Sequence, residues 1–208
     1  LATEVFEANT AFPLRLLQTA TFFNTDTFFN TDTILAAHLN HYALSKKQFV
    51  DWGKMLSSAA KTRFVNIRLE HMYGPGDDPT KFTSWIMHQC IQSVPKIDLT
   101  AGEQQREFIY IDDVVSAYRL LLCSCKLSEQ PFSEIELGSG TPVTIRHFVE
   151  SVSRLSGSSS QLNFGALPYR DGETMHSSAD LTALTQFGWK PNVPLELGIL
   201  ETLRSMGI

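Results

Sequence analysis

The apolar residues of this chain follow two different spacings. A spacing of three to four residues predicts helices at 8–19, 42–60, 81–93, 112–125, 141–155, 178–188 and 194–206. Short apolar runs predict buried strands at 21–24, 63–67, 96–100, 106–110, 134–137 and 162–165. Because strands and helices alternate, we expect an α/β fold with a doubly wound parallel sheet.

The composition of the 208 residues is ordinary for a globular protein, with 43% apolar and 19% charged residues. The net charge of −5 and the lack of a Lys/Arg stripe argue against nucleic-acid binding. No run of about 18 apolar residues occurs, so we expect no membrane span. We expect Cys90, Cys123 and Cys125 to be buried thiols in a reducing cytoplasm. The histidines show no metal-ligand spacing, so no metal site is expected.

Tyr42 and Lys46 occur as YALSK within a predicted helix. Residues i and i+4 share one helix face, and a cation beside a phenol stabilises the phenolate, so Tyr42 could transfer a proton near neutral pH. By itself, this spacing more often marks a surface lysine after a packed tyrosine. Thr25 lies 17 residues upstream, directly after the predicted strand at 21–24. Ligands bind beyond the carboxyl ends of such strands, so its hydroxyl is expected to hold a substrate oxygen against Tyr42.

Together with further stretches, this set resembles the extended branch of the short-chain dehydrogenase/reductase family, the NAD-dependent nucleotide-sugar epimerases, dehydratases and reductases. The sequence of these motifs is most similar to that of CDP-abequose synthase-like reductases, which act on a CDP-linked 4-keto-dideoxyhexose. The resemblance implies a Rossmann-type NAD(P)-binding fold with a smaller C-terminal α/β substrate lobe. The matching stretches are RLEHMYGPG (68–76), GEQQREFIYIDD (102–113), ELGSGTPVT (136–144) and YRDGETMHSSADLTALTQFGWKPNVPLELGI (169–199).

The resemblance also implies roles for single residues. Tyr42 would be the general acid/base at carbon 4 of the sugar, and Thr25 would hydrogen-bond the 4-oxygen. Lys46 would bind the cofactor ribose and lower the pKa of Tyr42. The remaining implied contacts are Leu1, Ala2, Thr3 and Asn9 for the cofactor, and Asp26, His71, Arg106 and Arg170 for the nucleotide sugar.

Three acidic or basic positions leave alternatives open. Asp26 either faces the sugar or satisfies the turn after its strand. His71 stands where the family usually has Asn, so it contacts the substrate or is a structural histidine. Asp112 and Asp113 are expected to stabilise a helix N-terminus rather than to act as catalytic carboxylates.

Thr27 separates two reaction types. The 4,6-dehydratases of the family have Thr-Asp-Glu where this chain has Thr25-Asp26-Thr27, and a threonine hydroxyl is no base near pH 7. We therefore expect an NAD- or NADPH-dependent reductase of a nucleotide-diphosphate sugar, with NADPH favoured. A 4-epimerase of the UDP-glucose or UDP-N-acetylglucosamine type is the alternative. A non-catalytic cofactor-binding sensor is a weaker hypothesis, because it needs no phenolic acid.

The two predicted lobes divide along the chain. Residues 1–68 are assigned to the remainder of the NAD(P)-binding domain, with parts of 97–125 and 134–150, and residues 69–96 and 151–208 to the nucleotide-sugar-binding lobe. The family's glycine-rich phosphate turn does not occur in the sequence. LATEV is interpreted as the end of a strand. The joins Glu4-Val5 and Ala20-Thr21 are too short to hold a loop between two elements, so we expect that residues of the natural chain are omitted at the front and at both joins. The resemblance further implies a homodimer packed through the helix that carries Tyr42. The NTDT motif occurs a second time at 30–33, with its threonines 9 and 11 residues before Tyr42, and we interpret this copy as part of a loop.

Overall fold

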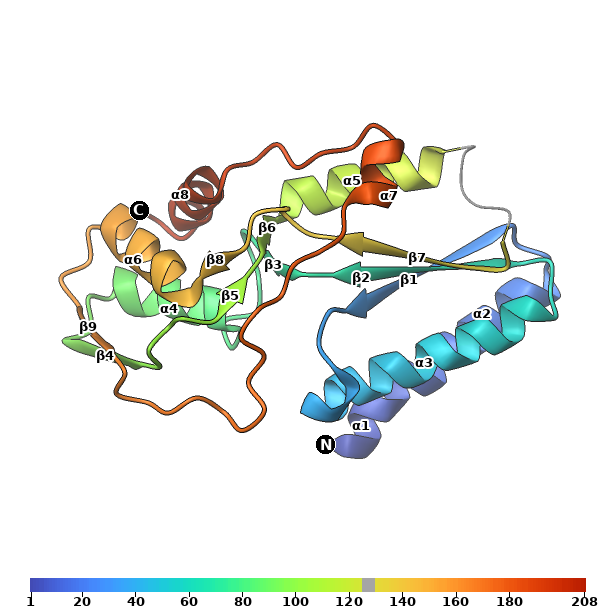
Figure 1. Cartoon of the computed structure of the whole chain (residues 1–208), viewed down its shortest axis with the longest axis horizontal. Coiled ribbons are helices and arrows are strands. Elements are labelled where there is room, and N and C mark those ends of the chain that lie inside the picture. The colour runs from blue at the N-terminus through green and yellow to red at the C-terminus, as the bar shows by residue number, and fades with distance from the viewer. Residues whose placement is uncertain (125–129) are drawn as a thin grey trace. The chain divides into compact units, whose positions relative to one another are not determined.

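The computed structural model describes residues 1–124 and 130–208 of the chain (Figure 1). The chain divides into two compact units. The first comprises Leu1–Leu69, Leu121–Leu137 and Asp180–Gly188, and the second Glu70–Leu120, Gly138–Ala179 and Trp189–Ile208. The ligand roles assigned to the two lobes from the sequence stay a prediction.

The first unit is built on a three-stranded parallel sheet. Its order is β1 (Thr27–Thr33), β2 (Arg63–Leu69) and β7 (Phe132–Leu137). Helix α3 (His41–Ser58) connects β1 to β2, as Figure 1 shows. A parallel pair joined by a helix is the expected α/β crossover.

One face of this sheet begins with a row of aromatic rings. Phe28, Phe64 and Phe132 are register partners on the three strands, and their rings stack with centroids 5.8 and 6.2 Å apart. Phe49 of α3 packs edge-on against Phe64 at 5.6 Å. A Cβ on Gly53 would lie 2.4 Å from the Phe64 ring, so glycine is needed where α3 crosses the row. This cluster fixes α3 on the sheet.

The N-terminal residues form one continuous helical segment. It consists of α1 (Ala2–Phe6), the π-helical η1 (Glu7–Ala11) and α2 (Phe12–Phe22). The strand predicted at 21–24 is therefore wrong, because the helix continues until Asn24, whose φ of 53° ends it. Both joins that looked too short lie inside this helix, so no loop is needed at either, and the residues of LATEV after Leu1 are helical.

The second unit combines helices with three small sheets. β3 (His71–Tyr73) pairs with β6 (Phe108–Tyr110) and β4 (Lys96–Leu99) with β9 (Gln161–Phe164), both parallel, and β5 (Gln105–Arg106) pairs with β8 (Val143–Thr144) antiparallel. The other elements of the chain are η2 (Ala37–Leu39), α4 (Phe82–Ile91), α5 (Ile111–Cys123), α6 (Ile145–Ser156), α7 (Thr182–Gln186) and α8 (Leu195–Ser205).

The core of the second unit is centred on aromatic residues. Phe148 of α6 stacks on Phe108 with centroids 4.1 Å apart, and Tyr73 meets Phe148 edge-on at 6.0 Å. Thr144 caps α6 by accepting a hydrogen bond from His147 N. Asp113 is buried in the first turn of α5 and accepts hydrogen bonds from the backbone N–H groups of residues 192 and 193. Its role is structural.

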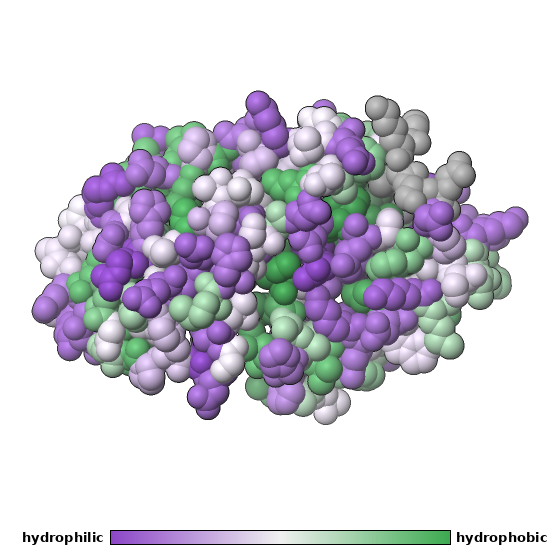
Figure 2. All heavy atoms as spheres, in the orientation of Figure 1, coloured by the Kyte–Doolittle hydropathy of each residue, from purple (hydrophilic) through white to green (hydrophobic). Residues whose placement is uncertain are grey.

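The surface is mixed in character. On the face drawn in Figure 2, hydrophilic and hydrophobic residues alternate in small patches. Cys90 is buried as expected, whereas Cys123 is exposed, and Cys125 lies outside the described residues. Among the described residues, no helix is long and apolar enough to cross a membrane, and no group of His, Cys, Asp and Glu side chains could hold a metal ion.

Candidate active site

The first turn of α3 positions Tyr42 and Lys46. Asn40 caps the helix by accepting a 2.8 Å hydrogen bond from Ala43 N, so that the helix begins one residue before Tyr42. Lys46 Nζ lies 5.9 Å from the centroid of the Tyr42 ring and donates to Thr31 O at 3.0 Å. The predicted pair therefore shares one helix face, next to the second half of β1.

The electrostatic environment of the pair is set by burial and by one carboxylate. Burial, and second the Asp32 carboxylate, raise the pKa of the Tyr42 phenol. Burial lowers the pKa of Lys46, and Asp32 opposes that shift. The direction at Tyr42 is opposite to the one expected from a neighbouring lysine, because burial and, second, the Asp32 charge raise this pKa. Tyr42 is 44% exposed and can meet a ligand.

The second NTDT copy, and not the first, lies in a strand that leads to this pair. Thr31, Asp32 and Thr33 are the last three residues of β1. Asp32 Oδ2 accepts a 2.6 Å hydrogen bond from Lys47 Nζ, which also donates to Thr33 O at 2.6 Å. Sequence reasoning missed Asp32 and Lys47, although the same TFF run precedes both copies of the motif.

A row of polar side chains crosses the sheet beside Asp32. Asn30, Asn66 and Glu134 are register partners on β1, β2 and β7. Asn30 Nδ2 donates to Asn66 Oδ1 at 2.8 Å, and Asn66 Nδ2 donates to Glu134 Oε2 at 2.9 Å and to Asp32 Oδ2 at 3.3 Å. The carboxyl half of this sheet face is thus polar, whereas its amino half carries the phenylalanine row.

Thr25 and Asp26 do not lie where the sequence predicted. Both are exposed and precede β1, so they are at its amino end. A strand of seven residues is about 20 Å long, which separates them from Thr33 by roughly that distance. The premise that Thr25 follows a strand is therefore wrong. The Asp26 backbone carbonyl accepts a hydrogen bond from Arg63 N at 3.1 Å, and the role of its carboxylate stays a prediction.

The predicted cofactor contacts at the N-terminus lie on the helical segment. Leu1, Ala2 and Thr3 are exposed at its start, and Asn9 is half-buried within the π-helical turn. Ala2 and Thr3 belong to a helix, whereas the sequence interpreted LATEV as the end of a strand. The neighbouring Thr10 ties this segment to α3, because its Oγ1 donates to Ser45 O at 2.8 Å. Contact of these residues with a cofactor stays a prediction.

In the second unit, His71 is oriented by a buried carboxylate. Its Nδ1 lies 3.2 Å from Glu70 Oε2, and the Glu70 side chain has no exposed surface. The other oxygen of Glu70 accepts a 2.5 Å hydrogen bond from Ser177 Oγ. The His71 side chain remains 32% exposed, so its outer ring edge can meet a ligand. The sequence singled out His71 but not the glutamate that holds it.

The two predicted phosphate-binding arginines have different surroundings. Arg106 is buried and its Nη2 lies 2.6 Å from Glu173 Oε1. Arg170 is exposed, and its guanidinium makes no hydrogen bond or ion pair within the part of the chain that the structure describes. Residues 175–177 run along Gln105, with hydrogen bonds of 2.9 and 3.1 Å between the two backbones, which brings both arginines into one region of the second unit.

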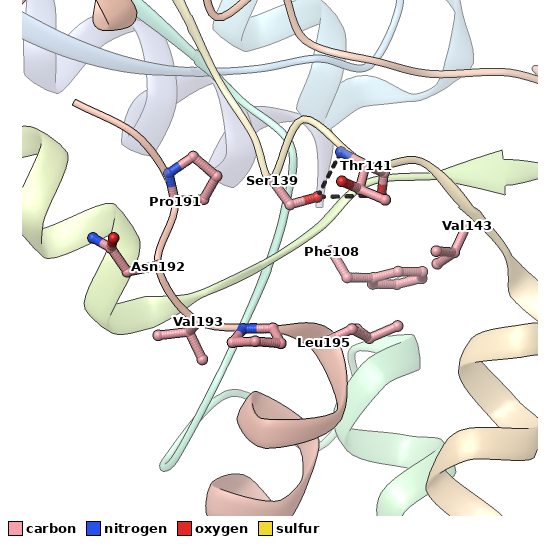
Figure 3. Close-up of a pocket in the computed structure, with 9 residues that line it drawn as sticks. Phe108, Ser139, Thr141, Val143, Pro191, Asn192, Val193 and Leu195 are labelled. Atoms are coloured by element: carbon pink, nitrogen blue, oxygen red, sulfur yellow. Dashed lines mark hydrogen bonds between the residues drawn. The ribbon is translucent and has the colours of Figure 1, made fainter. Parts of the chain in front are cut away.

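The second unit also contains a pocket of about 360 Å³ (Figure 3). Its lining consists of Phe108, Ser139, Thr141, Val143 and residues 191–195. Ser139 and Thr141 bond to each other at its rim, as the dashed lines in Figure 3 show. None of the predicted site residues lines it.

Comparisons with known proteins agree with the resemblance read from the sequence. The model of the NAD-dependent epimerase/dehydratase family matches residues 2–132. The CDP-abequose synthase of Salmonella typhimurium is 37% identical over 209 residues, which cover 96% of this chain and 69% of the relative. The CDP-abequose synthase of Salmonella muenchen is 32% identical, with 97% of this chain and 70% of the relative covered.

Solved structures show the same fold. The UDP-glucose 4-epimerase of Thermotoga maritima, solved with UDP-glucose, matches with a TM-score of 0.85 at 19% identity, over 99% of this chain and 71% of the other. The prediction of an α/β, Rossmann-type fold with a parallel sheet is confirmed.

Proposed function

Because this chain belongs to the NAD-dependent epimerase/dehydratase family, we propose that it reduces a nucleotide-linked 4-keto-hexose at carbon 4 with NAD(P)H. The substrate class is that of a CDP-linked 4-keto-dideoxyhexose, by analogy with the relatives named CDP-abequose synthase. The observation that carries the proposal is the placement of Tyr42 and Lys46 beside the end of β1, with Thr33 where a dehydratase needs a carboxylate.

The residues on α3 fit the ribose and nicotinamide end of a dinucleotide. Tyr42 and Lys46 present a hydroxyl and an ammonium on one helix face, and both side chains are partly exposed. These groups match the hydroxyl-rich ribose. When bound, the nicotinamide supplies the hydride for carbon 4.

Tyr42 supplies the proton of the reduction. Its raised pKa keeps the phenol protonated at neutral pH, which is the state needed to donate to the 4-oxygen as a hydride arrives. In an epimerase, the same phenol would first have to take a proton from the 4-hydroxyl, so the two reactions start from opposite protonation states of Tyr42.

The hydroxyl that was assigned to Thr25 is placed at Thr31 instead. Thr31 is exposed near the end of β1, and Lys46, which shares a helix face with Tyr42, donates to its carbonyl, so we assign the hydroxyl role to Thr31. Thr33 is buried and its Oγ1 accepts a hydrogen bond from Leu35 N at 3.3 Å. Because the second copy has the same letters as the first, the argument against 4,6-dehydration carries over from Thr27 to Thr33.

In the second unit, we assign the nucleotide diphosphate to Arg170 and His71. Arg170 offers a guanidinium that no side chain of the described residues neutralises, and guanidinium groups bind phosphate oxygens well. Arg106 is compensated by Glu173, so its first role is to hold the segment that carries Arg170.

A 4-epimerase is the second candidate, favoured by the likeness to UDP-glucose 4-epimerase. The complete protein is incubated with CDP-, dTDP- and UDP-linked 4-keto sugars and NADPH, and separately with UDP-glucose. Stoichiometric NADPH oxidation on a 4-keto sugar supports the reductase. Interconversion of UDP-glucose and UDP-galactose without net cofactor use would replace it by the epimerase.

We also propose that the protein forms a homodimer through the first unit. We further propose that it works in the cytoplasm, where NADPH is available. Large apolar side chains are exposed on α2 and α3, namely Phe12, Leu16, Leu44, Trp52 and Met55. Such a surface is typical of a protein interface. Sedimentation should give a dimer for the natural protein and a monomer for Trp52→Glu, and a monomer for both would contradict the interface.

A further inference from the structure

Lys47 follows Lys46 in the sequence, but its side chain has different partners. Lys46 Nζ donates to the carbonyl of Thr31, whereas Lys47 Nζ donates to Asp32 Oδ2 and to the carbonyl of Thr33, at 2.6 Å each. Lys46 and Lys47 thereby contact three successive residues of β1. This arrangement fixes the end of the strand against the start of the helix.

The Asp32 carboxylate depends on Lys47. Its side chain is 1% exposed, and that of Lys47 is 25% exposed. Within the described part of the chain, Asp32 Oδ1 has no hydrogen-bond partner, and the second donor to Oδ2 is Asn66 Nδ2 at 3.3 Å. A buried carboxylate is stabilised by a cation or by several donors, and Lys47 is the cation bonded to it.

The other charged groups around Asp32 are engaged elsewhere. Arg68, its register partner on β2, is paired with Glu136 at 2.6 Å and with Glu134 at 3.5 Å on β7. On α3, the Asp32 charge adds to the burial that raises the pKa of Tyr42, and it opposes the burial that lowers the pKa of Lys46.

We propose that Lys47 is a positioning residue for the acid–base step at Tyr42, because its ion pair holds the Asp32 carboxylate at the end of β1 and offsets its charge. The kinetic meaning of this proposal rests on the proposed function, whereas the electrostatic arrangement can be measured without turnover.

The direct test is a titration of the Tyr42 phenol. Protein labelled with ζ-¹³C tyrosine is titrated by NMR, with Tyr42→Phe identifying the signal. Lys47→Arg retains a charge at every pH used, and Lys47→Met removes it. The midpoint should be higher in Lys47→Met than in Lys47→Arg by about one pH unit or more, because Asp32 then acts uncompensated. Coinciding midpoints would overturn the proposal.

Two further variants keep the test decisive. Lys54→Met is the matched control, since Lys54 lies on the same helix but over the Phe132 ring at 4.9 Å, and it should leave the midpoint unchanged. If Lys47→Met does not fold, Asp32→Asn takes its place. It leaves the Lys47 charge unopposed, so the Tyr42 midpoint should fall below that of the natural protein, and an unchanged midpoint would count against the proposal.

Kinetics give the second readout. Turnover on the 4-keto substrate should fall about 10-fold or more in Lys47→Met, with an unchanged KM for the nucleotide sugar, and Lys47→Arg should restore most of it. A loss confined to KM would contradict a role in the proton transfer. If the natural protein reduces no keto sugar, the proposed function fails, while the titration still decides the role of Lys47.

Discussion

Asn30 on β1 donates a 2.8 Å hydrogen bond to the side chain of Asn66, its register partner on β2. Both amides are buried, at 7% and 0% exposure. They occupy the same sheet face as the stacked Phe28 and Phe64, two residues further along their strands. The sheet face thus changes from apolar to polar where the candidate site begins, and the Asn66 amide connects Asn30, Asp32 and Glu134.

Replacing Asn66 by Ala should lower the free energy of unfolding by about 2–3 kcal/mol. The substitution leaves the buried Asn30 amide without its acceptor and removes a donor from Asp32. Urea unfolding at neutral pH measures the change. Asn163→Ala is the matched control, since its 2.6 Å bond to Asp98 lies on the surface, and it should cost less than about 1 kcal/mol. Equal costs for the two variants would contradict a buried network.

The two NTDT copies can be separated by a pair of substitutions. Thr31→Ala should reduce turnover about 10-fold or more, because we assign its hydroxyl to the 4-oxygen of the sugar. Thr25→Ala should leave turnover within about twofold, because Thr25 is exposed at the other end of β1. Steady-state NADPH oxidation compares them. A larger loss in Thr25→Ala would restore the assignment made from the sequence.

The two copies of the motif could not be assigned to a helix or a strand from their local sequence. Most helices and strands were predicted to within a few residues, because their apolar spacing matches their burial. TFFNTD occurs twice with the same local pattern, and only pairing with β2 distinguishes the copies: Thr27 to Thr33 pair in register with Arg63 to Leu69. The first copy instead completes α2, where Thr19 and Thr21 hydroxyls bond to carbonyls of their own helix. The local sequence therefore does not determine which copy forms the strand.

The side chains that pair with the site residues were also not predicted from the sequence. Tyr42 and Lys46 were predicted from their spacing and Arg106 from the resemblance. Lys47 and Glu173 act through contacts with segments distant in the sequence, and Glu70 was missed although it is next to His71. Glu173, for example, compensates Arg106 across 67 positions of the chain. A motif identifies the residue type that chemistry needs, whereas burial and pairing decide its charge environment.

Stability should decrease above about pH 10 because of Tyr73. Burial raises the pKa of this phenol, so the folded protein holds the proton to a higher pH than the unfolded chain does. The resulting stabilisation is complete below the ordinary tyrosine pKa and is lost as pH rises above it, at about 1.4 kcal/mol per pH unit. Urea unfolding between pH 8 and 11 measures the slope.

Tyr73→Phe provides the comparison for that slope. It removes the ionising group and the 3.1 Å hydrogen bond to Leu195 O, so the variant should be less stable at pH 8 but should lose stability more slowly above pH 10. Parallel slopes for the two proteins would show that Tyr73 is not responsible.

Arg170→Ala should weaken binding of the nucleotide sugar without slowing chemistry. Loss of a guanidinium contact to phosphate should raise KM about 10-fold at unchanged kcat. Arg204→Ala serves as control, because Arg204 pairs with Glu201 on the exposed face of α8. An unchanged KM in Arg170→Ala would remove this residue from the binding site.

The central claim is that a hydride reaches carbon 4 of the sugar while Tyr42 supplies the proton. The complete protein is incubated with a CDP-linked 4-keto-dideoxyhexose and NADPH deuterated at the transferable position, and the product is analysed by NMR and mass spectrometry. The account predicts one deuterium at carbon 4 per NADPH oxidised. It also predicts that the Tyr42→Phe variant still binds cofactor but turns over at least about 100-fold more slowly. A product without deuterium, or unchanged turnover in Tyr42→Phe, would contradict it.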